Sequence, residues 1–308
     1  MNITLRQLSY LVALAEERHF GRAAQRVHVT QPALSTQIRE LEDRLGAPLI
    51  DRSDREFRLT PAGRDVLEGA QRIMQEVEKI ETQARWQEGL SGRLKLGIIP
   101  TVAPYLLPVA LPKLRMRDVT LDLRLTEAKT ERVLDAMADG ALDAAVVAIP
   151  AGMPGLIERP LFKDRFLLAA SRPFVETIVA RGERPEPATL NPNALLLLDE
   201  GHCLADQALE VCGTRRDATR VDLRASSLPT LCGMVAAGFG QTLLPEISLA
   251  KECAAAPDMD VMTFAEGQPH RTIGLVRRDL GGPDAWFTEL GDILTQAGQE
   301  LLGHDAAA

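Results

Sequence analysis

The chain has 308 residues, of which 45% are hydrophobic and 25% are charged, and this composition is typical of a soluble globular protein with two or three domains. Four cysteines are too few for a disulfide scaffold. Because neither a leader segment nor an apolar run of membrane length is evident, we expect a cytoplasmic protein. The formal net charge of −8 excludes a uniformly basic nucleic-acid binder, so any contact with DNA must rest on local placement of basic groups.

Residues 1–60 predict three short helices followed by a hairpin. The apolar stripe of the first helix is expected at Leu5, Leu8, Leu11, Val12 and Ala15. A second helix begins at Phe20, and a tight turn at Val29 separates it from a third. Thr30 is a good cap for that third helix, which we expect to end near Leu45 because Gly46 follows. The inward positions of the third helix are Leu34, Ile38, Leu41 and Leu45.

The outward face of the third helix carries small or hydrogen-bonding groups, which a DNA major groove can accept. The candidate DNA-contacting residues are Thr30, Gln31, Pro32, Ser35, Thr36 and Arg39. Two helices joined by a tight turn, the second polar outside and apolar inside, form a helix-turn-helix pattern. Residues 48–60 predict a two-stranded wing, whose Arg52 and Arg55 can reach phosphates or a minor groove. A small packing domain with a solvated polar face is the alternative.

Residues 62–87 predict one long helix without proline. Two apolar rows on adjacent faces repeat every seven residues: Ala70, Val77 and Ala84 in one, Val66, Ile73 and Ile80 in the other. Together the rows form an a/d seam of about three heptads, which favours pairing with a second copy of the helix. A homodimer through this helix would present two helix-turn-helix units to two half-sites. Packing of the same face on its own domain is the alternative.

Strand-like and helical segments alternate after a hinge at 89–92, which predicts βαβ units on a mainly parallel sheet. The expected strands cover 94–99, 121–125, 144–149, 166–170, 195–198, 222–225, 241–244 and 272–276. The expected helices, besides one starting at His202, cover 104–115, 130–139, 228–237 and 284–297. We infer two lobes, with the chain crossing near 165 and returning near 268. Ligands of such folds bind at strand carboxyl ends and helix N-termini, where Thr101, Thr130 and Cys203 fall.

The stretch from Asp199 to Cys212 contains two cysteines nine residues apart. Cys203 falls near the predicted start of a helix, where the macrodipole favours an anion, and His202 beside it could act as a cation or a hydrogen-bond donor. Nine helical residues rise about 13 Å and turn about 900°, so the sulfurs lie on opposite faces. A disulfide between them would require the helix to unwind and would act as a conformational switch. Two small, inert, buried cysteines are the alternative.

The segment AAQRVHVTQPALSTQIRELE, residues 23–42, resembles the helix-turn-helix of LysR-type transcriptional regulators. Three further stretches are similar to the hydrogen-peroxide-sensing members of that family: GIIPTVAPYLLP at 97–108, DEGHCLADQ at 199–207 and HRTIGLV at 270–276. The resemblance covers the whole chain. The His–Cys pair with a second cysteine nine residues on is the feature that is specific to the peroxide sensors.

The resemblance implies roles for individual residues. Cys203 corresponds to the peroxidatic cysteine and Cys212 to its resolving partner, whereas Cys232 and Cys253 match nothing that we can assign. The polar groups expected around peroxide are Thr101, Thr130, His202 and Arg271, with Asp206 as a further candidate. Oxidation of Cys203 to a sulfenic acid and condensation with Cys212 would then repack residues 200–215.

The resemblance also implies the architecture: a winged helix-turn-helix domain at 1–60, a linker and dimerisation helix at 61–88, and an α/β effector domain at 92–308 like a two-lobed periplasmic binding protein. Its lobes would be 92–165 plus 268–308, and 166–267. The implied partners are double-stranded promoter DNA, hydrogen peroxide, a homodimer or homotetramer, and RNA polymerase. We expect an activator, no enzyme activity, no membrane association, and neither a cofactor nor a metal.

Three other functions fit parts of the sequence. A LysR-type regulator that binds a small metabolite between its lobes would share everything except the trigger. A thiol peroxidase would use the cysteines but has no place for the helix-turn-helix and the pairing helix. A periplasmic solute-binding protein would share the two lobes, but the extra N-terminal domain and the missing signal segment count against it.

Overall fold

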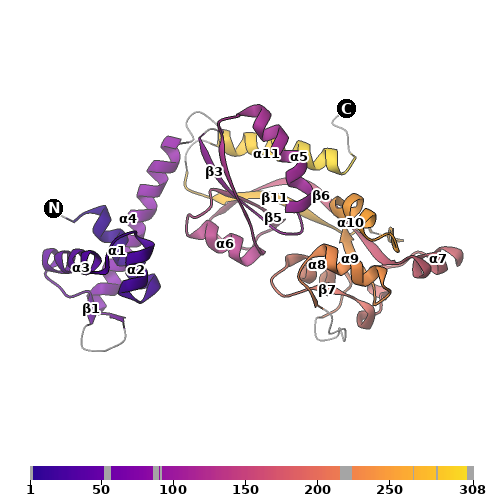
Figure 1. The fold of residues 1–308 in the computed structure, drawn as a ribbon, viewed down its shortest axis with the longest axis horizontal. Helices are drawn as coiled ribbons and strands as arrows, with labels where there is room; N and C mark the ends of the chain where they lie inside the picture. The colour runs from indigo at the N-terminus through magenta and orange to yellow at the C-terminus, as the bar shows by residue number, and fades with distance from the viewer. Residues whose placement is uncertain are drawn as a thin grey trace. The chain divides into compact units, whose positions relative to one another are not determined.

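The protein is described here from a computed structural model, which describes residues 3–51, 57–85, 90, 92–215, 224–265, 267–281 and 284–303. The chain forms two compact units, Met1–Ala84 and Arg85–Ala308 (Figure 1). Within the described residues, none of the helices combines the length and the apolar character needed to cross a membrane.

The first unit contains the three predicted short helices, α1 (Leu5–Glu17), α2 (Phe20–Arg26) and α3 (Gln31–Leu45). Side-chain caps fix where they begin: Oγ1 of Thr30 accepts from the backbone N–H of Ala33, and Nδ1 of His19 accepts from two N–H groups at the start of α2. Gly46 ends α3 with φ 68°, a conformation that glycine adopts without strain. Residues from all three helices form the core of this unit: Leu11, Leu14, Ala23, Leu34, Ile38 and Leu41.

The buried face of α1 differs from the predicted stripe. Leu5 is 48% exposed and Val12 and Ala15 are only half-buried. The buried positions are Gln7, Leu8, Tyr10, Leu11, Ala13 and Leu14. Gln7 is buried because its side chain completes the capping box with Thr4 and accepts from Arg44, so a polar residue occupies the inner face.

The wing consists of β1 (Ile50–Asp51) paired antiparallel with β2 (Arg58–Leu59). The carboxylate of Glu42 on α3 accepts from the backbone N–H groups of Leu49 and Ile50, which ties the wing to the helix. Arg52 and Arg55 lie outside the described residues. The predicted two-stranded hairpin is therefore confirmed at its base.

The long helix α4 covers Pro61–Arg85, so the prediction of 62–87 is confirmed as far as the described residues extend. Its predicted seam is partly covered: Ala70 is 1% exposed, but Ile73 is 46% exposed and Ile80 66%. Val66 packs against the helix-turn-helix core. Large aliphatic side chains in water near the far end of the helix are unfavourable for a lone chain.

The second unit is built on a seven-stranded sheet. Its strands are β3 (Arg93–Ile98), β4 (Asp122–Glu127), β5 (Ala144–Ile149), β6 (Leu156–Ser171), β9 (Thr242–Pro245), β10 (Met259–Met262) and β11 (His270–Arg278). The order is β10-β6-β11-β5-β3-β4, with β9 also paired to β6. Only β3 pairs in parallel, with β4 and β5, and the other four pairings in this sheet are antiparallel. The expectation of a mainly parallel sheet was wrong, because β11 returns antiparallel between β5 and β6.

Strand β6 changes partners along its length. Residues 156–165 pair with β11, and residues 166–169 and 168–171 pair with β9 and β10 respectively. Figure 1 shows this strand running from the region of β11 and β5 towards α9 and α10. The lobe boundaries at 165–166 and 267–268 stay a prediction.

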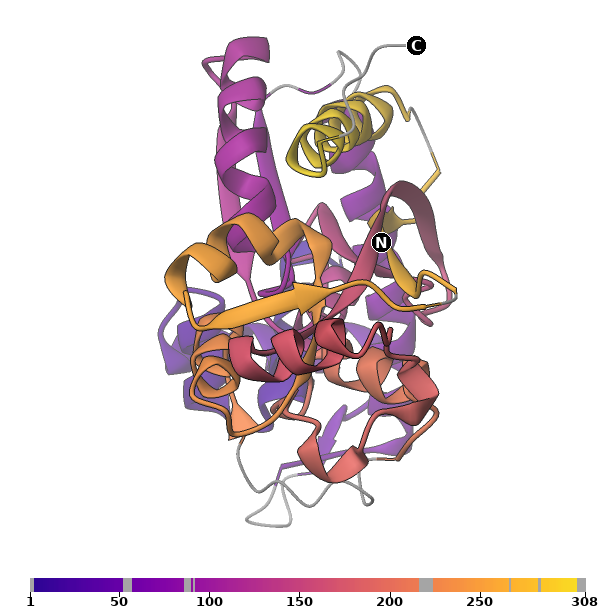
Figure 2. The same ribbon diagram turned by 90° about the vertical axis from the view of Figure 1, so that its right-hand side faces the viewer.

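Helices cover the two halves of this sheet separately. On one half lie α5 (Ala103–Arg117), α6 (Thr130–Ala138) and α11 (Ala285–Leu301), and α5 packs along α11. On the other half lie α7 (Arg172–Ala180), α8 (Cys203–Val211), α9 (Leu228–Ala236) and α10 (Leu249–Ala255), with α7 beside β10 (Figure 2). A short parallel pair, β7 (Leu197–Leu198) and β8 (Arg224–Ala225), precedes α8 and α9. The sequence patterns did not predict the helices α7 and α10 or the strand β10.

Candidate functional site

The two-cysteine stretch folds as its spacing predicts. After β7, Gly201 turns the chain with φ 87°, His202 occupies the cap position, and α8 begins at Cys203. Cys212 follows the last helical residue, and both thiols are free. Since α8 separates them, a Cys203–Cys212 bond requires this helix to unwind.

The two thiols differ in their surroundings. Cys203 is half-buried at the N-terminal end of α8, where the first backbone N–H groups lack helical partners. Cys212 is 7% exposed, and burial raises the pKa of its thiol to about 11. Cys212 is therefore kept as a neutral thiol, whereas Cys203 is the more accessible of the two sulfurs.

Arg271 and Thr101 are joined by two hydrogen bonds. Thr101 follows β3 and is 2% exposed; its Oγ1 accepts from Nη1 of Arg271 at 2.9 Å, and its carbonyl oxygen accepts from Nη2 at 3.1 Å. Because the hydroxyl oxygen already accepts from a guanidinium, the Thr101 proton is left to donate to another group. Arg271 thus orients Thr101 as a hydrogen-bond donor.

A buried carboxylate balances Arg271. Nε of Arg271 donates to Oδ2 of Asp164 at 2.9 Å, and both side chains are buried. The other oxygen of Asp164 accepts from the backbone N–H of Ile247 at 3.1 Å. Burial raises the pKa of Asp164, whereas the guanidinium and the N–H favour its ionised form. Arg271 is therefore held in place by a paired charge, and its other hydrogen bonds are to Thr101.

His202 is 4% exposed and faces one carboxylate and one ammonium group. Its Nε2 lies 3.0 Å from Oδ1 of Asp199, and that same oxygen lies 2.9 Å from Nζ of Lys129. Burial, and secondly Lys129, lower the pKa of His202, against the opposing effect of Asp199. A neutral imidazole follows, so of the two roles expected for His202, donor and cation, the structure favours the donor.

Oγ1 of Thr130, the first residue of α6, is buried and has no hydrogen-bond partner among the described residues. Nε2 of His202, the residue before Cys203, is also buried and makes no well-aligned hydrogen bond there, although it lies 3.0 Å from Oδ1 of Asp199. Buried polar atoms are normally satisfied, so the Thr130 hydroxyl is available to a small hydrogen-bonding molecule. Asp206, one turn further along α8, is exposed.

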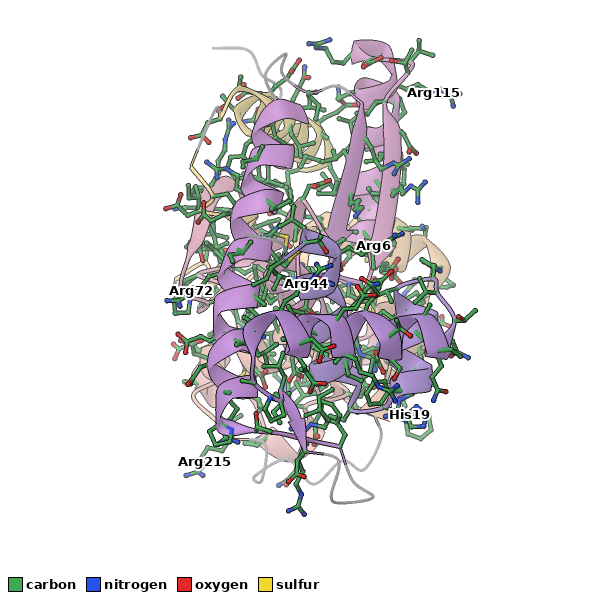
Figure 3. All side chains as sticks on the ribbon, turned by 90° about the vertical axis from the view of Figure 1, so that its left-hand side faces the viewer. Arg6, His19, Arg44, Arg72, Arg115 and Arg215 are labelled. Atoms are coloured by element: carbon green, nitrogen blue, oxygen red, sulfur yellow. The ribbon has the colours of Figure 1, made fainter. Side chains whose placement is uncertain are left out.

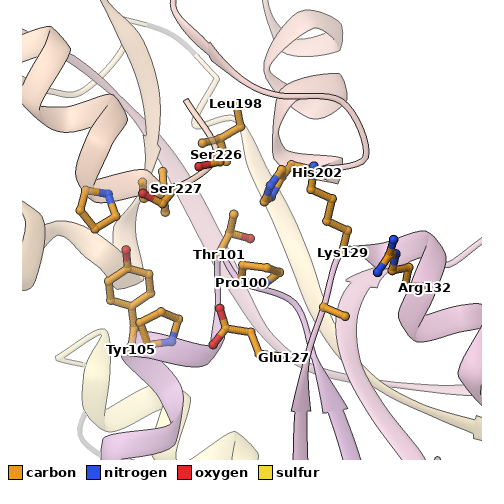
Figure 4. A pocket seen from close by; sticks show the side chains of 14 residues that line it. Pro100, Thr101, Tyr105, Glu127, Lys129, Arg132, Leu198, His202, Ser226 and Ser227 are labelled. Atoms are coloured by element: carbon orange, nitrogen blue, oxygen red, sulfur yellow. The ribbon is translucent and has the colours of Figure 1, made fainter. Parts of the chain in front are cut away.

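A cavity of about 560 Å³ opens next to these groups (Figure 4). Its wall includes Thr101, Tyr105, Lys129, Arg132, His202 and Ser227. Figure 4 shows Thr101 and His202 on neighbouring sides of this space, with Lys129 and Arg132 beyond His202. Cys203, Thr130 and Arg271 are not among the described lining residues, so the wall brings together Thr101 and His202 of the predicted set.

Sequence reasoning missed Asp164 and Asp199, which contact the predicted residues Arg271 and His202, and Lys129, which pairs with Asp199. It also missed Tyr105, whose hydroxyl donates to Oε1 of the buried Glu252 at 2.7 Å. Two of these residues could have been found from their positions in the sequence, because Lys129 directly precedes Thr130 and Asp199 is the first residue of the two-cysteine stretch. Within the described residues, groups of His, Cys, Asp and Glu that could hold a metal ion are absent.

The candidate DNA-contacting residues of the first unit lie on the exposed side of α3. Thr30, Gln31, Pro32, Thr36 and Arg39 are exposed and Ser35 is half-buried. The Thr36 hydroxyl donates to the carbonyl of Pro32 at 2.9 Å, which leaves its lone pairs outward. Figure 3 shows the side chains on the ribbon, with His19 of the first unit labelled at its edge.

Both units match known families. Residues 5–64 match the model of the bacterial regulatory helix-turn-helix proteins of the lysR family, and residues 87–299 match the LysR substrate binding domain. The chain belongs to the LysR family of bacterial helix-turn-helix regulators, and within it to the group of the hydrogen peroxide-inducible genes activators.

Individual relatives support the assignment to the hydrogen peroxide-inducible genes activators. The chain is 40% identical to the hydrogen peroxide-inducible genes activator of Pectobacterium carotovorum subsp. carotovorum, over 96% of each chain. It is 41% identical to the DNA-binding transcriptional dual regulator OxyR of Escherichia coli K12, over 90% of each.

The fold of this chain is similar to solved structures of OxyR proteins. Full-length OxyR of Pseudomonas aeruginosa, carrying a cysteine-to-aspartate substitution, has a TM-score of 0.70 at 34% identity, covering 97% of this chain and 95% of that one. A cysteine-to-serine mutant of Corynebacterium glutamicum OxyR with hydrogen peroxide bound has a TM-score of 0.65 at 35% identity, covering 99% and 95%. The fold class expected from the resemblance, an N-terminal helix-turn-helix followed by a two-lobed regulatory domain, is therefore confirmed.

Proposed function

We propose that this chain is a DNA-binding transcriptional activator that senses hydrogen peroxide through Cys203. Oxidation of Cys203 leads to a Cys203–Cys212 disulfide, which rearranges the regulatory domain. The main support is a half-buried cysteine at a helix N-terminus, directly after the buried His202, together with the buried Oγ1 of Thr130 that has no partner among the described residues. We place the protein in the cytoplasm, where its promoter DNA lies.

The chemistry follows from thiolate reactivity. The Cys203 thiolate attacks one peroxide oxygen, the S–O bond forms as the O–O bond breaks, and the leaving hydroxide takes a proton to become water. Thr101 and Thr130 are positioned to donate hydrogen bonds to the developing charge. Cys212 then attacks the sulfenic sulfur, the S–S bond forms, and a second water leaves.

The signal is a change of fold in α8. The reduced chain keeps nine helical residues between its sulfurs, and the disulfide is incompatible with that helix. The oxidant thus selects a second packing of residues 200–215, which is a two-state element biased by redox state.

The first unit supplies the DNA contacts in this proposal. The exposed face of α3 enters a major groove with Gln31, Ser35, Thr36 and Arg39, while Thr30 and Pro32 set the start of that helix. Arg52 and Arg55 of the wing contact the phosphates. The exposed Ile73 and Ile80 pair in a homodimer through 62–87, and dimers combine as a homotetramer that engages RNA polymerase.

The domain limits belong to the same proposal. The winged helix-turn-helix covers 1–60, the linker helix 61–88 and the effector domain 92–308. We also propose that the chain regulates without turnover of substrate, as its family of transcriptional regulators does.

A second candidate function uses the same fold with another trigger. The cavity of about 560 Å³ is much larger than hydrogen peroxide, whose volume is close to that of two waters, or about 60 Å³. Lys129 and Arg132 in its wall suit an anionic metabolite. Such a ligand would make the chain a metabolite-responsive regulator with inert cysteines.

One experiment separates the two. The reduced full-length chain receives one equivalent of peroxide, with and without promoter DNA, and its four thiols are mapped by mass spectrometry. The proposal expects selective loss of the Cys203 and Cys212 thiols and a linked peptide, while Cys232 and Cys253 stay reduced. Unchanged thiols, or a Cys203→Ser chain that still changes promoter output with peroxide, would contradict it.

A further inference from the structure

Lys129 joins the start of α6 to the turn that precedes Cys203. Its Nζ donates to the carbonyl oxygen of Glu200 at 2.6 Å and pairs with Oδ1 of Asp199 at 2.9 Å. One lysine therefore grips both a backbone and a side-chain oxygen of the same turn. We call these contacts the Lys129 clasp.

The turn is shaped around the lysine. Gly201 has φ 87°, and a Cβ added there would lie 3.0 Å from Cδ of Lys129, so the glycine lets the aliphatic stem lie against the backbone. The next two residues are His202 and Cys203. A displacement of the turn is passed directly to the thiol, because only two residues separate Glu200 from Cys203.

The clasp also orients His202. Asp199 Oδ1 lies between Nζ of Lys129 and Nε2 of His202, at 2.9 and 3.0 Å. Lys129 immediately precedes Thr130, whose buried hydroxyl oxygen has no hydrogen-bond partner among the described residues. The lysine thus fixes the spacing between the two elements that carry Thr130 and Cys203.

We propose that Lys129 is a positioning residue for the peroxide reaction: the clasp holds Cys203 in its peroxide-reactive place and holds α8 in its reduced fold. The proposal rests on the proposed peroxide-sensing function and names a residue outside the set that the resemblance implied. Loosening the clasp lowers the population of aligned thiolate, and it also releases the turn that must move before Cys203 meets Cys212.

The two effects act on two separate rates. Sulfenic acid formation is second order, so its rate rises with peroxide. The condensation with Cys212 is unimolecular, so the rate of disulfide formation reaches a plateau at high peroxide. The Lys129→Met variant keeps the stem and removes the charge. It should lower the initial slope and raise the plateau, each by about threefold or more, the size of a partly exposed charge pair.

The experiment measures disulfide formation in the full-length chain by rapid quenching and mass spectrometry over a range of peroxide concentrations. Sulfenic acid on Cys203 is trapped with dimedone in a Cys212→Ser background. Lys129→Arg, which keeps the charge, should restore both rates to within about twofold of wild type. Lys113→Met is the matched control, because Lys113 pairs with Glu300 at 2.8 Å between α5 and α11 and does not touch the turn.

A slope that falls while the plateau rises, with rescue by arginine, supports the proposal. Equal rates in wild type and Lys129→Met would overturn it. A joint fall of both rates, with a lowered melting temperature, would also overturn it by showing a structural role only. If the wild-type chain forms no Cys203 sulfenic acid, the proposed function itself fails, and that outcome is separate from these.

Discussion

Cys203 begins α8 and Cys212 directly follows it, and the proposed mechanism assigns the two thiols to different steps. Cys203 is half-buried at the helix N-terminus, and Cys212 is buried, with a pKa raised to about 11. A thiol with that pKa is almost entirely protonated at neutral pH, which agrees with the resolving role that we propose for Cys212. In the proposed mechanism, the different burial of the two thiols therefore sets the order in which they react.

Replacing Cys212 tests this order. Cys212→Ser should leave a sulfenic acid on Cys203 after peroxide, because the thiol that condenses with it is gone. Dimedone trapping with mass spectrometry detects the adduct. Cys253→Ser, which changes a half-buried cysteine outside the site, should form the disulfide as wild type does. If no adduct forms on Cys203 in the Cys212→Ser chain, the assigned roles are wrong.

Arg271 has a structural and a chemical task, and its replacement should reveal both. Arg271→Ala leaves Asp164 buried and unpaired, so the free energy of unfolding should fall by about 3–5 kcal/mol. The peroxide reaction should also slow, because Thr101 loses the donor that orients it.

Urea unfolding and stopped-flow oxidation measure these two effects. Arg165→Ala removes a largely exposed partner of Glu246 and should cost at most about 1 kcal/mol, which makes it the matched control. An Arg271→Ala chain as stable as wild type would contradict the buried pair.

Among the elements of the regulatory unit, α8 is a short helix, whereas β6 is a long strand. Strand β6 pairs with β11, β9 and β10 and spans both halves of the sheet. Helix α8 has nine residues and packs mainly by Leu204, Ala205, Ala208 and Leu209. A short helix beside a rigid sheet can change fold without unfolding its unit.

Hydrogen exchange should detect that change. Backbone amides of 203–211 should exchange faster in the oxidised chain, because the disulfide requires loss of their helical hydrogen bonds. Peptides from α5 serve as the internal control and should keep their protection. If oxidation leaves α8 as protected as in the reduced chain, the conformational switch is refuted.

At the scale of the molecule, α4 carries apolar side chains that its own unit does not cover. Ile73 and Ile80 are 46% and 66% exposed, seven residues apart on one face. Spaced by one heptad, they suit the seam of a second α4. Pairing at this seam would bring two α3 helices to two half-sites of one operator.

Negative charges introduced at positions 73 and 80 of α4 should weaken the pairing of two α4 helices. Ile73→Glu with Ile80→Glu should weaken self-association and DNA binding by about tenfold or more, since like charges would face each other across the pairing helices. Sedimentation velocity and a binding titration at fixed salt measure this. Gln71→Glu adds a charge to an exposed position beside the seam and is the control. An unchanged dimer would place the interface elsewhere.

Sequence patterns correctly predicted those helices whose ends are set by neighbouring residues. Thr30 and Gly46 bound α3 as expected, because caps act through neighbouring backbone groups. The placement of α8 between two cysteines also followed from local spacing. On α1 the pattern failed at Gln7, which is buried because a distant arginine and a capping partner satisfy its amide.

The sequence alone determined the helix-turn-helix, the long helix α4 and the helix between the two cysteines, since each depends on residues within a few turns of one another. Only the tertiary structure decided that β11 runs antiparallel between β5 and β6, that Asp164 balances Arg271, and that Lys129 grips the turn before Cys203. Asp164 and Arg271 are 107 residues apart, and Lys129 and Glu200 are 71 apart. Pairings across such distances depend on how the whole chain packs, which no local pattern encodes.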